Sequence, residues 1–323
     1  MVQPKYLKEE KIIFYDVVRW FFLATIIGLG SGLLVSFFIK LLDWGTAYSQ
    51  NFSKYFWIAP VFFITNIVLI KYLAPDAEGH GTEKVIEAIH KRAGRIRVAV
   101  IPIKLITTLL TLFSGGSVGK EGPSAQMGGG LSSLLADILK FNDEDRKKLV
   151  ICGISAGFAA IFGTPISGAV FGIEVLFVGV LLYDVLLPSF VAGITAFYIT
   201  HLMGVTRTDY HIDFTAGINE FFILKVALAG VAFGICAFLF IEVMNRTEAL
   251  TNKIKIHFLL KGLIGGSIII LIGSLFGTEA LGLGTSTVTG IFNGVKIVWY
   301  LFFLKIIVTS VTLNFGGSGG VVT

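Results

Sequence analysis

The stretch from Gly115 to Gln126 reads GGSVGKEGPSAQ and places one acidic side chain, Glu121, inside a run of glycines. Glycines leave backbone N–H groups open to a ligand, and Pro123 suits the first turn of a helix. A helix that begins here points its unpaired N–H groups and the positive end of its dipole at the break, which forms an anion site. Glu121 is then a tethered competitor for the anion. Ionised, it fills the site; protonated or displaced, it leaves the site open. We therefore predict a gating role for Glu121.

Two other interpretations use the same residues. Glu121 can simply cap the start of the helix. The stretch also resembles a nucleotide-binding glycine loop, but such a loop has Ser or Thr after its lysine and follows a strand of a parallel sheet. Here Glu121 follows Lys120, and no parallel sheet is predicted. The anion site is therefore the stronger prediction.

A second copy of this pattern lies in the other half of the chain. Lys104 begins KLITTLLTLFSGGSVG, and Lys305 begins KIIVTSVTLNFGGSGG. At nearly the same spacing, Gly79-His80-Gly81-Thr82 matches Gly282-Leu283-Gly284-Thr285. Repeated halves with glycine breaks in matching positions are typical of transporters whose broken helices meet near the bilayer midplane. We expect a single membrane domain, 1–323, with a first inverted repeat at 13–203 and an incomplete second repeat at 219–323.

The composition supports a membrane protein. Hydrophobic residues make up 54% of the 323 residues and charged residues only 15%, whereas soluble domains carry about a quarter charged residues. We predict an all-α polytopic protein of the cell membrane that contacts the lipid bilayer. Apolar segments are expected at 13–42, 56–74, 98–114, 121–140, 146–161, 164–182, 184–203, 219–245, 258–277, 283–294 and 296–313.

The spacing of Cys, His and carboxylates indicates no metal site and no cofactor, and no hydrolase motif is present, so we do not expect an enzyme. Lys and Arg gather in 4–11, 84–97, 140–148 and 246–261. Excess Lys and Arg mark cytoplasmic loops, which predicts a cytoplasmic N-terminus. The same rule explains the basic run HKRAGRIR within 90–97, so no nucleic-acid partner is expected.

Three stretches resemble the CLC family of chloride channels and chloride/proton antiporters. Gly119-Lys120-Glu121-Gly122-Pro123 resembles that family's Gly-Lys/Arg-Glu-Gly-Pro signature. The run GISAGFAAIFGTPISG at 153–168 is similar to the two helices that follow it, and GGSGGVVT at 316–323 resembles the opening of the second-half signature. The resemblance implies a CLC-type inverted-repeat fold with broken and re-entrant helices, and a homodimer with one anion pathway per subunit. No cytoplasmic regulatory domain is visible.

The resemblance also implies an anion site. Its residues are expected to be His80, Gly119, Lys120, Glu121, Gly122, Gly319, Gly320, Val321 and Val322. His80 stands where the family has a serine that touches the central anion, and an imidazole N–H can donate to an anion. Alternatively, His80 turns out into the cytoplasmic vestibule. Lys104 matches a buried lysine of the family that raises the positive potential along the pathway; alternatively, it extends to the cytoplasmic surface.

Two departures from the family bear on mechanism. Antiporters of the family place a proton-relay glutamate where this chain has Val175, directly after Glu174. Valine cannot pass on a proton, so we predict channel-like transport of chloride or a similar small anion, with chloride/proton antiport as the alternative because some antiporters lack that glutamate. Fluoride-selective relatives usually alter the signature around Pro123, which is kept here.

The chain also stops at Thr323, inside the second-half signature. The C-terminal part of the second half, with the family's anion-coordinating tyrosine, is therefore expected to be missing. This gives a second alternative, a truncated fragment or a subunit without transport of its own.

Overall fold

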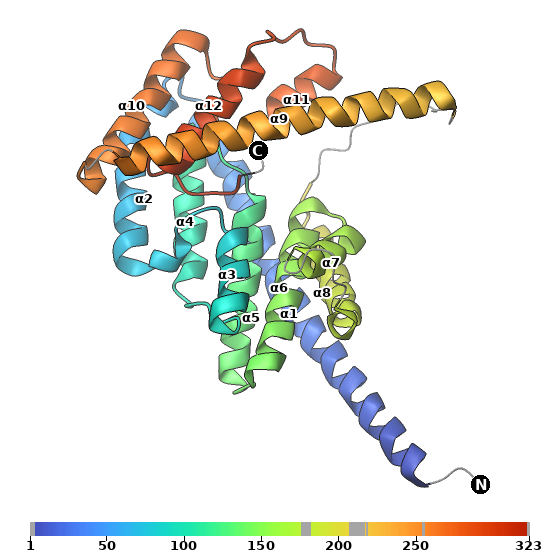
Figure 1. The fold of residues 1–323 in the computed structure, drawn as a ribbon. Coiled ribbons are helices and arrows are strands. Elements are labelled where there is room, and N and C mark those ends of the chain that lie inside the picture. The colour runs from blue at the N-terminus through green and yellow to red at the C-terminus, as the bar shows by residue number, and fades with distance from the viewer. Residues whose placement is uncertain (1–3, 176–181, 207–216, 218, 254–255, 322–323) are drawn as a thin grey trace.

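In the computed structural model, residues 4–175, 182–206, 217, 219–253 and 256–321 are described, and every regular element within them is helical (Figure 1). The α-helices are α1 (Pro4–Gln50), α2 (Ala59–Leu73), α3 (Thr82–Arg92), α4 (Val100–Phe113), α5 (Glu121–Ile138), α6 (Asp143–Phe162), α7 (Pro165–Glu174), α8 (Tyr183–Leu202), α9 (Glu220–Lys253), α10 (Phe258–Phe276), α11 (Thr285–Phe292) and α12 (Leu301–Asn314). Two short 3-10 helices, η1 (Tyr55–Ile58) and η2 (Pro75–Ala77), precede α2 and α3.

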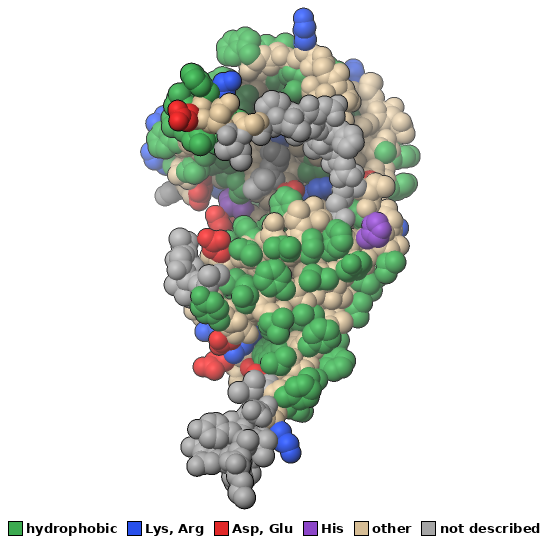
Figure 2. Space-filling model, turned by 90° about the vertical axis from the view of Figure 1, so that its right-hand side faces the viewer, with side chains coloured by type: hydrophobic (Ala, Val, Ile, Leu, Met, Phe, Trp, Pro, Cys, Tyr) green, Lys and Arg blue, Asp and Glu red, His purple; other side chains and the backbone are tan. Residues whose placement is uncertain are grey.

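The apolar helices fit a bilayer. Among the described residues, five helical stretches are long and apolar enough to cross a membrane: Phe14–Gln50, Tyr55–Leu73, Tyr183–Leu202, Glu220–Lys253 and Phe258–Phe276. α4 and α12 are shorter apolar helices. On the side where α7 and α8 lie, Figure 2 shows a broad hydrophobic surface with most of the visible charged side chains at its margins. Such a surface is stable only against lipid or another protein, which confirms the predicted all-α polytopic class.

The predicted segments correspond to helices, but several bounds differ. α1 and α9 extend beyond the predicted ends at 42 and 245, and the last part of the segment predicted at 164–182 lies mostly outside the described residues. α12 begins at Leu301 rather than at 296, because the chain turns after α11 at Gly294, whose φ is 81°. α3 was not predicted as a helix at all. It has only 11 residues and a basic end, which is why its sequence resembles a cytoplasmic loop. Its apolar residues Val85, Ala88 and Ile89 are buried in the main hydrophobic cluster.

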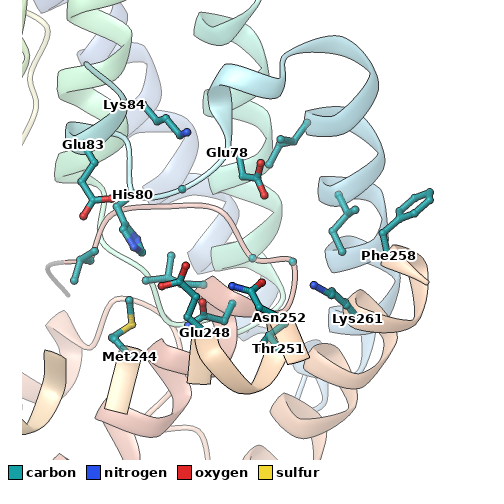
Figure 3. Close-up of a pocket in the computed structure, with 18 of the residues that line it drawn as sticks. Glu78, His80, Glu83, Lys84, Met244, Glu248, Thr251, Asn252, Phe258 and Lys261 are labelled. Atoms are coloured by element: carbon teal, nitrogen blue, oxygen red, sulfur yellow. The ribbon is translucent and has the colours of Figure 1, made fainter. Parts of the chain in front are cut away.

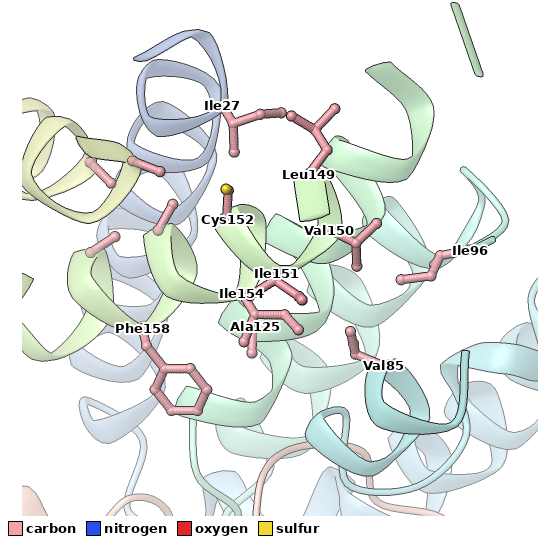
Figure 4. Close-up of a cluster of buried hydrophobic side chains, with 14 of the residues drawn as sticks. Ile27, Val85, Ile96, Ala125, Leu149, Val150, Ile151, Cys152, Ile154 and Phe158 are labelled. Carbon is pink, nitrogen blue, oxygen red and sulfur yellow. The ribbon is translucent and has the colours of Figure 1, made fainter. Parts of the chain in front are cut away.

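α6 lies at the centre of the first half and fixes the position of α5. Cys152, Ile154 and their neighbours on α6 are buried within the main hydrophobic cluster (Figure 4). Small residues let the two backbones approach: a side chain at Gly157 would collide with the Ser124 backbone of α5, and one at Gly128 would collide with the backbone of Gly153. Small residues serve this purpose at helix contacts in membranes. The N-terminus of α5, with Glu121, is therefore held by a tightly packed helix pair.

The two glycine-rich breaks cross each other. Gly119 and Gly320 exchange both backbone hydrogen bonds, with N···O distances of 2.9 and 2.7 Å. On either side, the Ser117 N–H donates to Thr312 Oγ1 at 3.1 Å, and the Ser318 N–H donates to Thr111 Oγ1 at 2.9 Å. These contacts join equivalent positions of the two matching stretches. Irregular backbone at membrane depth requires such partners within the protein.

Replacing Thr111 or Thr312 by valine should destabilise the protein. Valine has nearly the same shape but leaves the Ser318 or Ser117 N–H buried without a partner, which costs about 1–3 kcal/mol. We expect each variant to lower the unfolding midpoint in detergent, measured by scanning fluorimetry. The control is Thr289→Val on α11, since Thr289 is half-buried and its hydroxyl donates to the Thr285 carbonyl of its own helix. Equal midpoints for the three variants would contradict a stabilising role for the crossing.

Candidate anion site

A cavity of about 590 Å³ lies at the N-terminus of α5. Its walls come from the starts of three helices, the end of α6 and the second glycine-rich break. The lining residues are His80, Thr82, Glu83, Glu121, Gly122, Phe158, Phe162, Thr164, Ser167, Gly168, Phe171 and Val321.

The three helix starts give the cavity a positive electrostatic character. α3 begins at Thr82, α5 at Glu121 and α7 at Pro165, and the first turn of each contributes to the lining. The first N–H groups of a helix have no partner within the helix, and its dipole is positive at that end. Convergent helix N-termini are an established way of binding anions. The three helix starts therefore aim N–H donors at the cavity that contains Glu121, and anion binding there stays a prediction.

Glu121 is the acidic group at the centre of this arrangement. Its side chain is half-buried at the first position of α5. The carboxylate oxygen Oε2 is buried and has no hydrogen-bond partner among the described residues. A buried polar atom without a partner is unfavourable by about 1–3 kcal/mol. Protonation removes the cost of burying the charge, and movement of the side chain lets the oxygen find a partner, so the geometry suits a group that changes state.

Backbone packing brings the starts of α3 and α5 together. A side chain at Gly122 would collide with the carbonyl oxygen of His80, and a Cβ atom at Gly81 would lie 2.6 Å from the carbonyl oxygen of Gly122. Gly81 also has a φ of 87°, a conformation that other residues rarely adopt. Gly320 lies against Gly122 from the second break. These contacts require glycine, which explains the glycines in both signatures.

His80 lies beside both Glu121 and a second cavity. Its ring is half-buried, and its Nδ1 atom is buried without a hydrogen-bond partner in the described part of the chain. His80 lines the 590 Å³ cavity and also a larger one of about 830 Å³, shown in Figure 3. His80 therefore lies between the cavity that contains Glu121 and a second cavity, and its contact with an anion stays a prediction.

Lys104 is fully buried, so the alternative in which it extends to the surface is wrong. Its Nζ atom donates to the carbonyl oxygens of Ala77 at 3.1 Å and Gly79 at 2.6 Å. It therefore fixes the loop that carries His80. Lys305 donates in the same way to the Gly282 carbonyl at 2.6 Å. Both matching stretches thus use a lysine to hold their glycine loop.

The other predicted site residues have varied positions. Gly119 and Gly320 form the backbone crossing, and a side chain at Gly319 would collide with Val118. Lys120 is half-exposed and lines neither cavity, so only its backbone lies near the site. Val321 lines both cavities, and Val322 lies outside the described residues.

Val175, the expected proton-relay position, follows the last residue of α7 and packs against the main hydrophobic cluster. It lines neither cavity.

The sequence did not predict the aromatic wall formed by Phe158, Phe162 and Phe171. Phe158 and Phe162 stack with ring centroids 5.7 Å apart, and Phe171 lies 3.9 Å from Phe158. Phenylalanine is so frequent in this chain that its residue type alone gives no functional signal.

Comparison with known proteins identifies the family. The family model described as voltage-gated chloride channel matches residues 61–323. A protein of Pseudomonas syringae pv. tomato named "Chloride/fluoride channel protein" is 31% identical over 95% of this chain and 69% of its own length. The "H(+)/Cl(-) exchange transporter ClcA" of Vibrio cholerae is 26% identical over 93% of this chain and 68% of its own length.

Solved structures show the same fold. The crystal structure of a CLC-type fluoride/proton antiporter superposes with a TM-score of 0.89 at 25% identity, covering 95% of this chain and 78% of the other. A slow cyanobacterial Cl⁻/H⁺ antiporter superposes with a TM-score of 0.78 at 23% identity, covering 94% and 75%. The chain belongs to the voltage-gated chloride channel family, the CLC family, and has its fold.

Proposed function

We propose that this protein exchanges a halide ion for protons across the membrane, and that Glu121 takes part in both movements. The observation that carries the proposal is the buried Oε2 atom of Glu121, which has no hydrogen-bond partner in the described part of the chain and lies where three helix N-termini meet. An anion and an ionised carboxylate compete for the same N–H groups. A proton neutralises the carboxylate and ends the competition. Alternate occupation by anion and protonated Glu121 is a simple form of exchange.

The relatives support exchange over the channel-like reading. The fluoride/proton antiporter of known structure and the Vibrio cholerae exchange transporter both couple an anion to protons, according to their names. The cargo we propose is chloride or fluoride. Pro123 favours chloride within the family signature, whereas two relatives have names that include fluoride. The two ions differ in size and in the strength with which they accept hydrogen bonds, so they are to be compared directly.

The test is simultaneous measurement of anion efflux and proton uptake. Purified protein is reconstituted into vesicles loaded with potassium chloride or potassium fluoride, and the anion gradient is released with valinomycin present. We expect proton uptake that is proportional to anion efflux and stops when the anion gradient is exhausted. Anion efflux with no proton movement would overturn exchange.

That last outcome is what the second candidate, an uncoupled channel, predicts. Val175 favours it, because valine at this position cannot pass on a proton, and the Pseudomonas syringae relative is named as a channel. Under this hypothesis Glu121 still gates the pathway, but a halide gradient drives no uphill proton transport.

Three further expectations concern the whole molecule. We propose that 13–203 and 219–323 are inverted repeats, since Lys104 and Lys305 hold their glycine loops in the same way. We propose a cytoplasmic N-terminus, because Lys and Arg gather in 4–11 and 84–97 and an excess of Lys and Arg marks cytoplasmic loops. A homodimer is also proposed, as in the family that the signatures resemble.

Replacing His80 by serine should change the relative rates of chloride and nitrate transport. The imidazole is a larger donor than a hydroxyl, and its ring occupies part of the cavity wall beside Glu121. We expect a shift of about threefold to tenfold in the rate ratio, equivalent to about 1 kcal/mol of differential binding. The ratio is measured by vesicle efflux. An unchanged ratio in both His80→Ser and His80→Ala would show that anion coordination comes from backbone N–H groups alone.

A further inference from the structure

His80 separates two cavities. The smaller cavity is lined by Glu121. The larger cavity, of about 830 Å³, extends from His80 towards α9 and α10. The residues that line both are His80, Glu83 and Val321. Val321 is apolar, and Glu83 is exposed. Among these three shared residues, His80 alone combines a titratable group with a buried, unpaired polar atom.

The larger cavity brings carboxylates to the side of His80 that faces away from α5. In Figure 3 the imidazole points towards Glu248 on α9, with Glu83 on the neighbouring turn of α3. The other charged groups that face this cavity are Glu78, Lys71, Lys84 and Lys261. Lys104 lies behind the loop, where it is bonded to backbone carbonyls. On the opposite side, the smaller cavity is lined by Glu121 as well as by the shared residue Glu83.

An imidazole between two carboxylates has the chemistry of a proton relay. Its two nitrogens are distinct, so it can accept a proton on one and release a proton from the other. The Nδ1 atom of His80 has no described partner that would hold its proton in place. Val175, by contrast, lines neither cavity and has no titratable group.

We propose that His80 is the proton relay between Glu248 in the larger cavity and Glu121 in the smaller one. The inference rests on the proposed exchange function and supplies the step that Val175 cannot perform. A protonated Glu248 gives its proton to one imidazole nitrogen, which leaves a carboxylate and an imidazolium ion. The imidazolium releases the proton on its other nitrogen to the Glu121 carboxylate. One proton moves from Glu248 to Glu121, and His80 returns to the neutral form.

The discriminating quantity is the number of protons moved per anion. His80→Gln keeps an N–H donor for the anion but cannot carry a proton, so we expect the ratio to fall by about tenfold or more. A change in anion binding alone alters the rate of both fluxes and leaves their ratio intact. Glu248→Gln should lower the proton uptake rate and shift its pH profile, since it removes the donor. Lys261→Gln, on the α10 wall of the same cavity, is the matched control and should keep the wild-type ratio.

Each result has a separate meaning in the two-flux vesicle assay with the full chain. If the wild type moves no protons, the exchange function fails and the relay fails with it. If the wild type is coupled and His80→Gln keeps its ratio, exchange stands and the relay is overturned. If His80→Gln loses both fluxes and Glu248→Gln behaves as wild type, His80 serves the anion alone, and the relay is again overturned. A coupled wild type with an uncoupled His80→Gln and a slowed Glu248→Gln supports it.

Discussion

Glutamine in place of Glu121 should abolish proton uptake and leave anion efflux running at every pH. In the wild type, an ionised Glu121 competes with the anion for the N–H groups at the start of α5. Lowering the pH protonates the carboxylate and frees the site, so wild-type efflux should rise as pH falls. Glutamine is neutral throughout, so the variant's efflux should not respond to pH.

The expected size follows from the electrostatics of the helix terminus. A carboxylate at this position gains about 1 kcal/mol from the dipole and the unpaired N–H groups. Losing a competitor of that strength should raise the apparent anion affinity by about fivefold. Proton uptake should fall to the level of empty vesicles, because glutamine at the start of α5 cannot accept or release the proton that the exchange requires.

The matched control is Glu174→Gln. Glu174 is the last residue of α7, is exposed, and lines neither cavity. Its replacement should preserve both the proton-to-anion ratio and the pH dependence of efflux. A pH dependence that survives in Glu121→Gln, measured with anion and pH electrodes on the same vesicles, would remove Glu121 from the gate.

Local sequence patterns were sufficient to predict most helices and the position of Glu121. The reason is that an apolar segment or a glycine break can be recognised from neighbouring residues in the sequence alone. α5, for example, begins at Glu121, where the glycines and Pro123 predicted a helix start. α3 was not predicted as a helix, because its apolar face is short and its role is evident only from its packing against α5.

Contacts between distant segments could not be predicted from the same patterns. The exchange of hydrogen bonds between Gly119 and Gly320 depends on how the two halves pack. The position of Glu248 also depends on this packing, because Glu248 lies on a long apolar helix with no motif around it. His80 was predicted by its place in the family signature, but its position between two cavities follows from tertiary structure alone. The residue type of Lys104 was likewise compatible with two placements, and only the packing of η2 against α4 decides between them.

The burial of Lys104 predicts that its replacement destabilises the protein more than replacement of Lys305, its partner in the second half. Lys104 is fully buried and donates to two carbonyls, whereas Lys305 is partly buried and donates to one, that of Gly282. Methionine has a similar length and no donor. A hydrogen bond from a charged group contributes about 1.5–3 kcal/mol. Removing the buried charge recovers part of that loss by eliminating its desolvation penalty.

Lys104→Met should therefore destabilise the protein by about 3 kcal/mol and Lys305→Met by about half as much. Both are measured as unfolding midpoints in the same detergent. The two variants should also differ in transport. Lys104 holds the loop that carries His80, so Lys104→Met should slow anion efflux and lower the proton-to-anion ratio together. Lys305→Met leaves that loop in place and should keep the wild-type ratio. Equal losses of stability and coupling in the two variants would mean that the loop before α3 does not depend on Lys104 for its conformation.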